Sequence, residues 1–142
     1  MSRHTIRRYL TVNPHAVTSR QTLAEAHQAM REKGVRHLPV VDDGKLLGVV
    51  SQRDLYLLET LRGVDAAREL VEEAMSAEPV VVDPDAALDV VAETMALHKH
   101  GSALVVEHST LVGIFTTTDA LRALVALLRK NRKGVEEDDG PS

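Results

Sequence analysis

The 142-residue chain repeats itself at an interval of 65 residues, and this repeat restricts the folds that it can adopt. Residues 14–58 align without a gap on residues 79–123, and nine of the paired positions are identical. One matched pair of stretches repeats polar residues in addition to apolar ones. Residues 48–54 read Gly-Val-Val-Ser-Gln-Arg-Asp, and residues 113–119 read Gly-Ile-Phe-Thr-Thr-Thr-Asp. A duplicated apolar pattern predicts a duplicated fold, and the recurring glycine, hydroxyl and carboxylate indicate a shared function.

A core shared by the two copies is the first consequence of this repeat. A unit of about 60 residues buries little surface by itself, so we expect the copies to pack together into one α/β unit. Hydrophobic residues make up 44% of the chain and charged residues 27%, proportions that are typical of a soluble globular protein.

Composition and charge argue against several classes of protein. Without cysteine the chain has neither disulfides nor thiol chemistry. Its apolar runs fall short of the roughly 18 residues that span a bilayer, and residues 1–8 lack the apolar core of a signal peptide. A net charge of −4 and three aromatic residues argue against a nucleic-acid partner. We therefore expect a cytoplasmic protein that binds neither a membrane nor a nucleic acid.

Hydrophobic periodicity predicts the same order of elements in each copy: strand, helix, strand, strand, helix. Apolar residues at helical spacing indicate a helix over residues 19–33 and another after Asp85, with Ser19 and Asp85 as capping residues. The turn at residues 42–45 contains a glycine and suits a tight hairpin, whereas the turn at residues 107–110 lacks one and is expected to be less regular. The expected strands cover residues 16–18, 38–41, 46–50, 80–82, 103–106 and 111–115, and the expected final helices cover residues 54–61 and 119–128.

These elements divide the chain into four parts. The first copy takes residues 1–62 and the second takes residues 75–130. Between them, residues 63–74 have apolar positions at helical spacing, which predicts a linker helix rather than a flexible tether. Residues 131–142 are strongly charged and end in Gly-Pro-Ser, which is typical of a solvated, frayed and disordered tail.

The duplicated order, with Leu-Pro-Val-Val-Asp before a hairpin and Gly-x-x-[Ser/Thr]-x-x-Asp after it, resembles the tandem cystathionine β-synthase (CBS) domain, often called a Bateman module. The resemblance covers roughly residues 9–129. It implies two β-α-β-β-α repeats packed with pseudo-twofold symmetry, and a regulatory module that binds adenosine nucleotides or related adenosyl compounds. It also implies that two modules associate into a flat disc. Residues 102–106 depart from the expected strand sequence, which implies an altered second pocket.

The repeated polar residues suit a nucleotide. A ribose presents neighbouring 2′ and 3′ hydroxyls, and one ionised carboxylate accepts hydrogen bonds from both, a role that fits Asp54 and Asp119. Each aspartate lies where a strand passes into a helix, so backbone N–H groups and the helix dipole favour a phosphate nearby. Ser51 and Thr116, three residues earlier, can each add a hydroxyl contact.

Charge is expected to differ between the two pockets. Thr118 adds a hydroxyl in the second copy, whereas Arg53 takes its place in the first and brings positive charge. Arg36 and His37 precede a strand where related modules often carry residues that contact phosphate, while residues 101–102 are Gly-Ser. We expect the first copy to supply more of the charge that binds phosphate. Because the copies pack face to face in this family, these residues also come within reach of a pocket shared with the other copy.

The same residues also have a purely structural interpretation. Glycine permits a tight backbone, and an aspartate at a helix start caps free N–H groups whether or not a ligand binds. His98 and His100 lack further metal ligands nearby, so no metal site is expected. The chain contains neither a nucleophile elbow nor a phosphate-binding loop, and we therefore expect no catalytic residues and no enzymatic activity.

The sequence as a whole predicts a small module that senses an adenosine-containing ligand and modulates a partner protein. The identity of that partner is not encoded in any motif of the sequence. AMP, ADP, ATP and S-adenosylmethionine are the candidate ligands, and no cofactor is required. The leucine-rich helices at residues 55–61 and 120–128 exceed what a monomer needs to cover its core, which predicts a homodimer. The alternative is a constitutive dimeric scaffold that binds no ligand.

Overall fold

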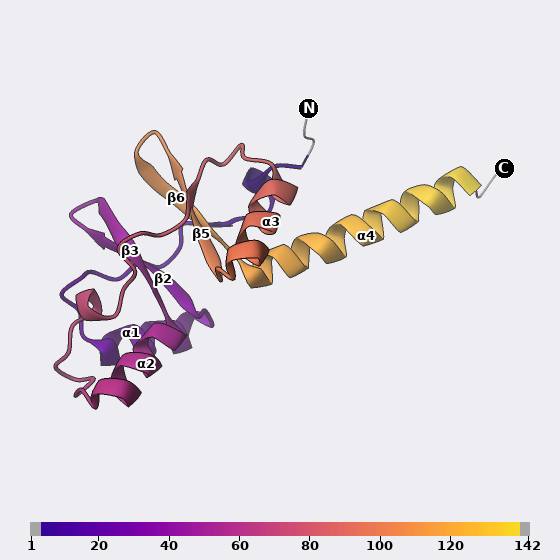
Figure 1. Ribbon diagram of the computed structural model, residues 1–142. Helices are drawn as coiled ribbons and strands as arrows, with labels where there is room; N and C mark the ends of the chain where they lie inside the picture. Colours follow the sequence, from indigo (N-terminus) through magenta and orange to yellow (C-terminus); the bar gives the residue numbers. More distant parts are fainter. Residues whose placement is uncertain (1–3, 140–142) are drawn as a thin grey trace.

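The computed structural model describes residues 4–139, with side chains described as far as Lys133. It consists of two similar halves, each a hairpin with two helices beside it, which confirms the predicted α/β class (Figure 1). The first half contains α1 (Leu23–Lys33), β2 (His37–Asp42), β3 (Lys45–Ser51) and α2 (Gln52–Arg62). The second half contains β4 (Val81–Val82), α3 (Leu88–His98), β5 (Ser102–Glu107), β6 (Thr110–Thr116) and α4 (Thr117–Asp139).

The two halves share one strand arrangement, although the outer strands are shorter in the first. In the second half, β1 (Thr11–Val12) pairs antiparallel with β6, and β4 pairs parallel with β5, which gives the order β1-β6-β5-β4. In the first half the β2–β3 hairpin has single bridges in place of outer strands, Val49 with Ser76 and Val17 with Val40. The expected strand at residues 16–18 is therefore one bridge, because only Val17 exchanges hydrogen bonds with β2.

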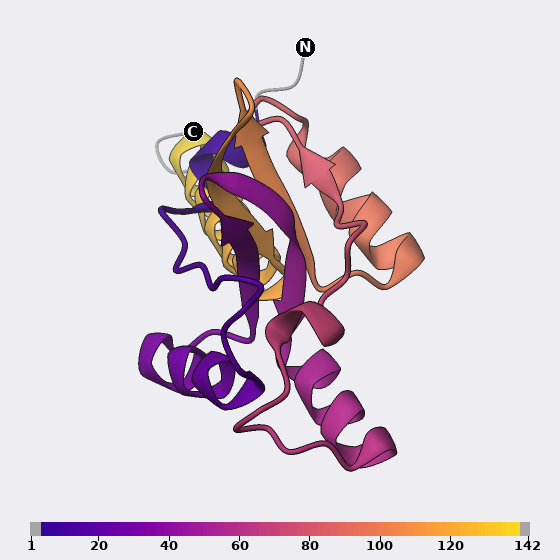
Figure 2. The ribbon, with the colours of Figure 1, turned by 90° about the vertical axis from the view of Figure 1, so that its left-hand side faces the viewer.

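Each half is completed by the chain segment that precedes the other half. The 3-10 helix η1 (Ile6–Arg8) lies against the second half (Figure 2), and its Ile6 is fully buried in the second core together with Phe115. Arg7 fixes this segment, with Nε 3.0 Å from Asp85 Oδ1 and Nη2 2.7 Å from Glu107 Oε2. Residues 5–12 thus pack against the second half, although they precede the first half in the sequence.

The expected linker helix at residues 63–74 is wrong. Its one regular element is the 3-10 helix η2 (Val71–Glu73), and Val71 is fully buried in the core of the first half. The backbone N–H groups of Leu23 and Ala24, at the start of α1, donate to the carbonyls of Glu69 and Ala66. These carbonyls satisfy donors that a helix start leaves free, so tertiary hydrogen bonds override the helical preference of this segment.

The helix starts differ from the expected caps. Thr22, rather than Ser19, caps α1 and forms a capping box with Glu25. The Ser19 N–H and hydroxyl instead donate to Asp42, and these bonds hold the pKa of the Asp42 carboxyl below its usual range. Asp85 likewise does not cap α3, because its carboxylate is taken by Arg7, a bond that lowers the pKa of Asp85.

Both hairpin turns have the same geometry, although only the first contains glycine. Asp43 and Gly44 have φ angles of 49° and 79°, and His108 and Ser109 have φ angles of 52° and 64°. Two consecutive positive φ angles are typical of the two-residue turn that matches the twist of a hairpin. The prediction of a less regular second turn is therefore wrong, and the pairing of the flanking strands imposes the turn on residues that rarely adopt it.

The repeated glycines lie where the flanking segments cross the hairpins. A Cβ atom on Gly48 would overlap the backbone carbonyl oxygen of Ser76, and one on Gly113 would lie 2.7 Å from the carbonyl oxygen of Thr11. Both positions therefore require glycine for the close approach of two backbones. The close approach lets the segments around Thr11 and Ser76 pair with the hairpin strands. Backbone packing therefore explains why glycine occurs at both positions.

Helix α4 extends well beyond the predicted end at residue 128, to Asp139 (Figure 1). No proline interrupts the chain between residues 117 and 139, so nothing in the sequence forces an earlier end. Residues 131–139 are thus helical in place of the expected disordered tail, and residues 140–142 of that tail lie outside the described part of the chain.

Candidate ligand-binding clefts

Two clefts lie between the halves, and the internal repeat relates one to the other. Each cleft is lined by three parts of the chain. These are the strand-to-helix turn of one half, the start of a strand in the other half, and the segment that crosses the hairpin. The Asp119 cleft has a volume of about 890 Å³ and is lined within residues 11–15, 33–37 and 114–122. The Asp54 cleft has a volume of about 830 Å³ and is lined within residues 36–37, 49–60, 76–80 and 99–102.

Asp54 forms a capping box at the start of α2. Its Oδ2 accepts a hydrogen bond of 2.9 Å from the Ser51 N–H, and its own N–H donates to Ser51 Oγ at 3.0 Å. Within the described part of the chain, Ser51 N–H is the one hydrogen-bond donor to this carboxylate. Asp54 is partly buried, and its second oxygen is free to accept from a ligand.

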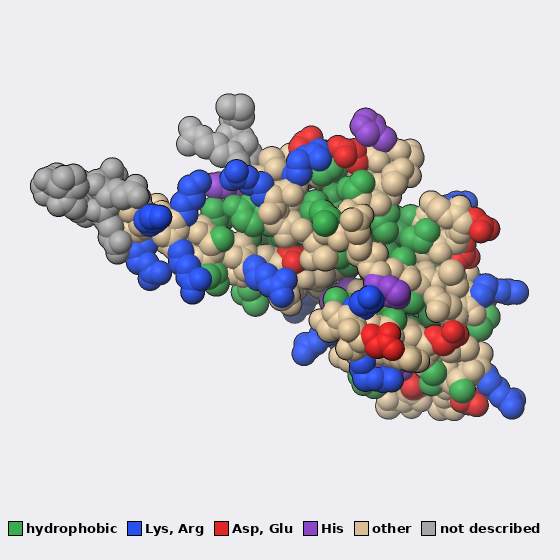
Figure 3. Space-filling view, turned by 180° about the vertical axis from the view of Figure 1, so that it is seen from behind, with side chains coloured by type: hydrophobic (Ala, Val, Ile, Leu, Met, Phe, Trp, Pro, Cys, Tyr) green, Lys and Arg blue, Asp and Glu red, His purple; other side chains and the backbone are tan. Residues whose placement is uncertain are grey.

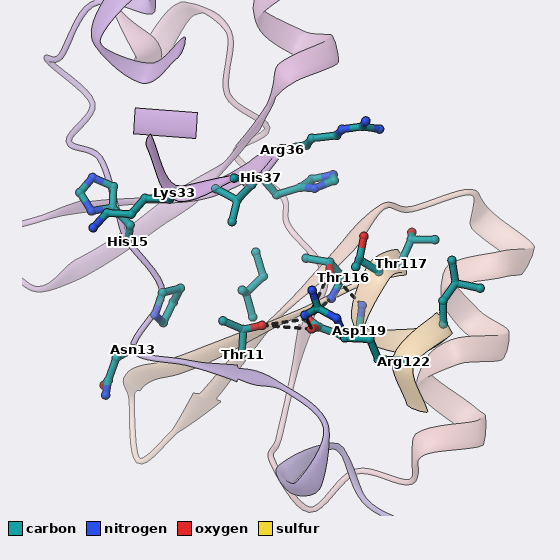
Figure 4. A pocket seen from close by; sticks show the side chains of 16 residues that line it. Thr11, Asn13, His15, Lys33, Arg36, His37, Thr116, Thr117, Asp119 and Arg122 are labelled. Atoms are coloured by element: carbon teal, nitrogen blue, oxygen red, sulfur yellow. Dashed lines mark hydrogen bonds and ion pairs between the residues drawn. The ribbon is translucent and has the colours of Figure 1, made fainter. Parts of the chain in front are cut away.

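Asp119 occupies the equivalent position at the start of α4, but its carboxylate has more hydrogen-bond and ion-pair partners than that of Asp54 (Figure 4). Its Oδ2 accepts from the Thr116 N–H at 2.9 Å and from Thr116 Oγ1 at 3.1 Å. Thr11 Oγ1 lies 3.0 Å from Oδ1 and 3.2 Å from Oδ2. Arg122 Nη1 lies 3.7 Å from Oδ1, and the aspartate is only 3% exposed. The capping role that the sequence left open is thus observed for both aspartates.

Basic residues of the first half face the carboxylate of the second half. Lys33, Arg36 and His37 line the Asp119 cleft together with His15 and Arg122. Of the residues from which the sequence predicts phosphate-binding charge in the first copy, Arg36 and His37 thus lie across a shared cleft from Asp119, and Arg53 does not line that cleft. Arg36 and His37 also border the Asp54 cleft, so they stand between the two clefts.

The His37 ring is packed between the halves. A Cβ atom on Gly101 would lie 2.6 Å from His37 Nε2, so the absence of a side chain at residue 101 makes room for the ring. Burial lowers the pKa of His37, an effect that nearby Arg36 reinforces and the Asp54 carboxylate opposes. The imidazole is therefore neutral at pH 7, and it offers hydrogen bonds rather than fixed positive charge.

The remaining predicted residues are divided between the clefts. Arg53 lines the Asp54 cleft, where Lys99 supplies a further positive charge and Glu78 a negative one. Thr118 lines the Asp119 cleft. The structure therefore does not bring Arg53 and Thr118 together.

Several lining residues were missed by the sequence analysis. Thr11, Lys33 and His15 line the Asp119 cleft, and Lys99 and His100 line the Asp54 cleft. For Thr11 the sequence did contain a signal, the repeat interval of 65 residues. This interval relates Thr11 to Ser76, and the two residues lie against the paired glycines Gly113 and Gly48. Extending the aligned region toward the N-terminus would have included this pair.

The described residues lack two further features, a metal-binding cluster and a membrane-spanning helix. Within residues 4–133, whose side chains are described, no three or more His, Asp or Glu residues are grouped so that they could hold a metal ion. Among the helices of residues 4–139, none is both long and apolar enough to cross a membrane.

Comparison with known proteins identifies the fold. The sequence model of the CBS domain matches residues 6–58 and again residues 71–126. A putative acetoin utilization protein (AcuB) from Vibrio cholerae superposes with a TM-score of 0.82 at 35% identity, over 91% of this chain and 96% of that one. CBSX2 from Arabidopsis thaliana, solved in complex with AMP, superposes with a TM-score of 0.77 at 28% identity, over 87% of this chain and 98% of that one.

The CBS domain pair of protein MJ0100 is similar as well. It was solved in complex with 5′-methylthioadenosine and S-adenosyl-L-methionine, and it superposes with a TM-score of 0.78 at 25% identity, over 86% of this chain and 96% of that one. Both repeats match one family, and the structural neighbours are pairs of the same domain. This chain belongs to the CBS domain family and is a tandem pair of CBS domains, a Bateman module.

Proposed function

We propose that this protein is a regulatory module that binds an adenosine-containing ligand in the clefts between its halves and thereby modulates a partner protein. The observation that carries the proposal is the composition of each cleft, which pairs a carboxylate at a helix start with basic side chains from the facing half. The carboxylate suits the ribose diol, and the basic groups suit the phosphate.

The ligands of structural neighbours support the same chemical class. CBSX2 was solved with AMP, and the MJ0100 pair with 5′-methylthioadenosine and S-adenosyl-L-methionine. These three compounds share an adenosine group and differ in the charge attached to the ribose. The positively charged Lys33, Arg36 and Arg122 around the Asp119 cleft favour the phosphorylated members of the class, AMP, ADP and ATP.

Thermal unfolding tests the proposal. A ligand present at 100 times its Kd stabilises the folded state by about 2.7 kcal/mol, which raises the Tm of a domain of this size by about 10 °C. We expect such a rise with at least one of AMP, ADP, ATP and S-adenosylmethionine, and none with free adenine, which lacks both the ribose diol and the phosphate. A Tm that none of them changes would support the constitutive scaffold instead.

We also propose that the module is a homodimer in solution. Large apolar side chains are exposed on α2 and α4, among them Leu61 at 78%, Leu121 at 59% and Leu128 at 58%. Figure 3 shows α4 as a projecting arm on which hydrophobic side chains lie among Lys and Arg side chains. A second copy that covers this helical surface would remove it from water.

Charged substitutions on this surface are expected to separate the dimer. Leu121→Glu combined with Leu124→Glu would place four carboxylates across the twofold contact, and we expect a monomer mass by light scattering at high micromolar concentration. Val12→Glu is the control, because Val12 is 63% exposed but lies on β1, outside the helical surface. A monomer mass for the unsubstituted protein would contradict the proposal.

A further inference from the structure

The two equivalent carboxylates differ in how much hydrogen-bonding capacity they have left. An ionised carboxylate offers about four acceptor positions on its two oxygens. At Asp119 these positions receive the Thr116 N–H, the Thr116 hydroxyl and the Thr11 hydroxyl. At Asp54, within the described residues, they receive the Ser51 N–H alone.

The difference comes from the segments that cross the hairpins. Thr11 pairs with Ile114 on β6, and this register directs its hydroxyl to both oxygens of Asp119 (Figure 4). Ser76 has the same backbone place, since it pairs with Val49 on β3, and it also borders a cleft. Yet among the described hydrogen bonds none joins the Ser76 hydroxyl to Asp54. The backbones are thus equivalent, while the hydroxyl contacts are not.

The two carboxylates also differ in burial, and the one with more hydrogen-bond partners is the more buried. Asp119 is 3% exposed, and Arg122 Nη1 lies 3.7 Å from its Oδ1. Asp54 is partly open to its cleft. A ribose diol brings two hydroxyl donors, which Asp54 can accept with little rearrangement. At Asp119 the same diol must first displace the Thr11 hydroxyl.

We propose that Thr11 determines the difference between the clefts: its hydroxyl occupies Asp119 in the free protein and so weakens ribose binding there relative to the Asp54 cleft. This inference rests on the proposed function, because it concerns how the two clefts share an adenosine ligand. The Asp54 cleft fills first, and the Asp119 cleft fills at higher ligand concentration.

Calorimetric titration with AMP tests this difference in variants that retain one carboxylate. In Asp54→Asn, where the Asp119 cleft remains, adding Thr11→Val removes the competing donor and keeps the shape of the side chain. We expect AMP affinity to rise about 3- to 10-fold, the effect of one net hydrogen bond. Thr11→Ser retains the hydroxyl and is expected to leave affinity within about twofold, which separates the hydroxyl from a general effect on β1.

Ser76→Ala in the Asp119→Asn protein is the matched control for the other cleft. It removes a hydroxyl from the equivalent backbone position, and because none of the described hydrogen bonds joins that hydroxyl to Asp54, we expect no gain in AMP affinity. An unchanged or reduced affinity on Thr11→Val would overturn the role of Thr11 and leave the proposed function intact. Absence of AMP binding to the unsubstituted protein would overturn both the role of Thr11 and the proposal of AMP as ligand.

Discussion

Gly48→Ala is expected to lower the free energy of unfolding by about 3 kcal/mol, which lowers the Tm by about 10 °C. The added Cβ would overlap the carbonyl oxygen of Ser76, a backbone atom that is itself hydrogen-bonded to the Val49 N–H at 3.1 Å. The segment that crosses the hairpin must therefore move away, and it carries the buried Val71 with it. Chemical denaturation followed by circular dichroism measures the loss.

Gly34→Ala is the matched control. Gly34 ends α1 with φ of 65°, but a Cβ there meets no atom within 4 Å. Its replacement is expected to cost about 1 kcal/mol, from backbone strain alone. If Gly48→Ala costs no more than Gly34→Ala, the close approach of the two backbones does not restrict residue 48 to glycine.

The second large effect is expected on ligand binding. Asp54→Asn and Asp119→Asn should each weaken AMP at their own cleft by about 10- to 100-fold, because hydrogen bonds to an ionised acceptor contribute about 1.5–3 kcal/mol. A two-site titration then retains one binding event in each variant. The carboxamide oxygen of asparagine still accepts from the residue 51 or 116 N–H, so the helix start is preserved.

An unchanged Tm in the absence of ligand is the control for these variants. It would show that the loss of binding does not come from a disturbed α2 or α4. Two binding events that persist in both variants would exclude the aspartates as the ribose contacts.

Local patterns in the sequence predicted the elements and the repeated motif. The stripe of Leu23, Ala26 and Met30 is buried as expected, and Gly34 ends the helix in the left-handed region. The strands of both hairpins lie within one residue of their predicted bounds, because β-branched content and turn residues act locally. The same reasoning placed Asp54 and Asp119 at equivalent strand-to-helix turns.

Features that depend on distant pairing were not predictable in this way. Residues 63–74 have a helical pattern, but their carbonyls cap α1 and their apolar residues fill the first core. Ile6 is buried beside residues more than 75 positions away, which no local window detects. The difference between Asp54 and Asp119 depends likewise on Thr11, which lies 108 residues before its partner.

The most direct test of the central claim compares AMP with 2′-deoxy-AMP in calorimetric titrations of the unsubstituted protein. If the carboxylates of Asp54 and Asp119 bind the ribose diol, loss of the 2′ hydroxyl removes a charge-assisted hydrogen bond. The account predicts that AMP binds about 5- to 100-fold more tightly than 2′-deoxy-AMP. Equal affinity for the two nucleotides would contradict it.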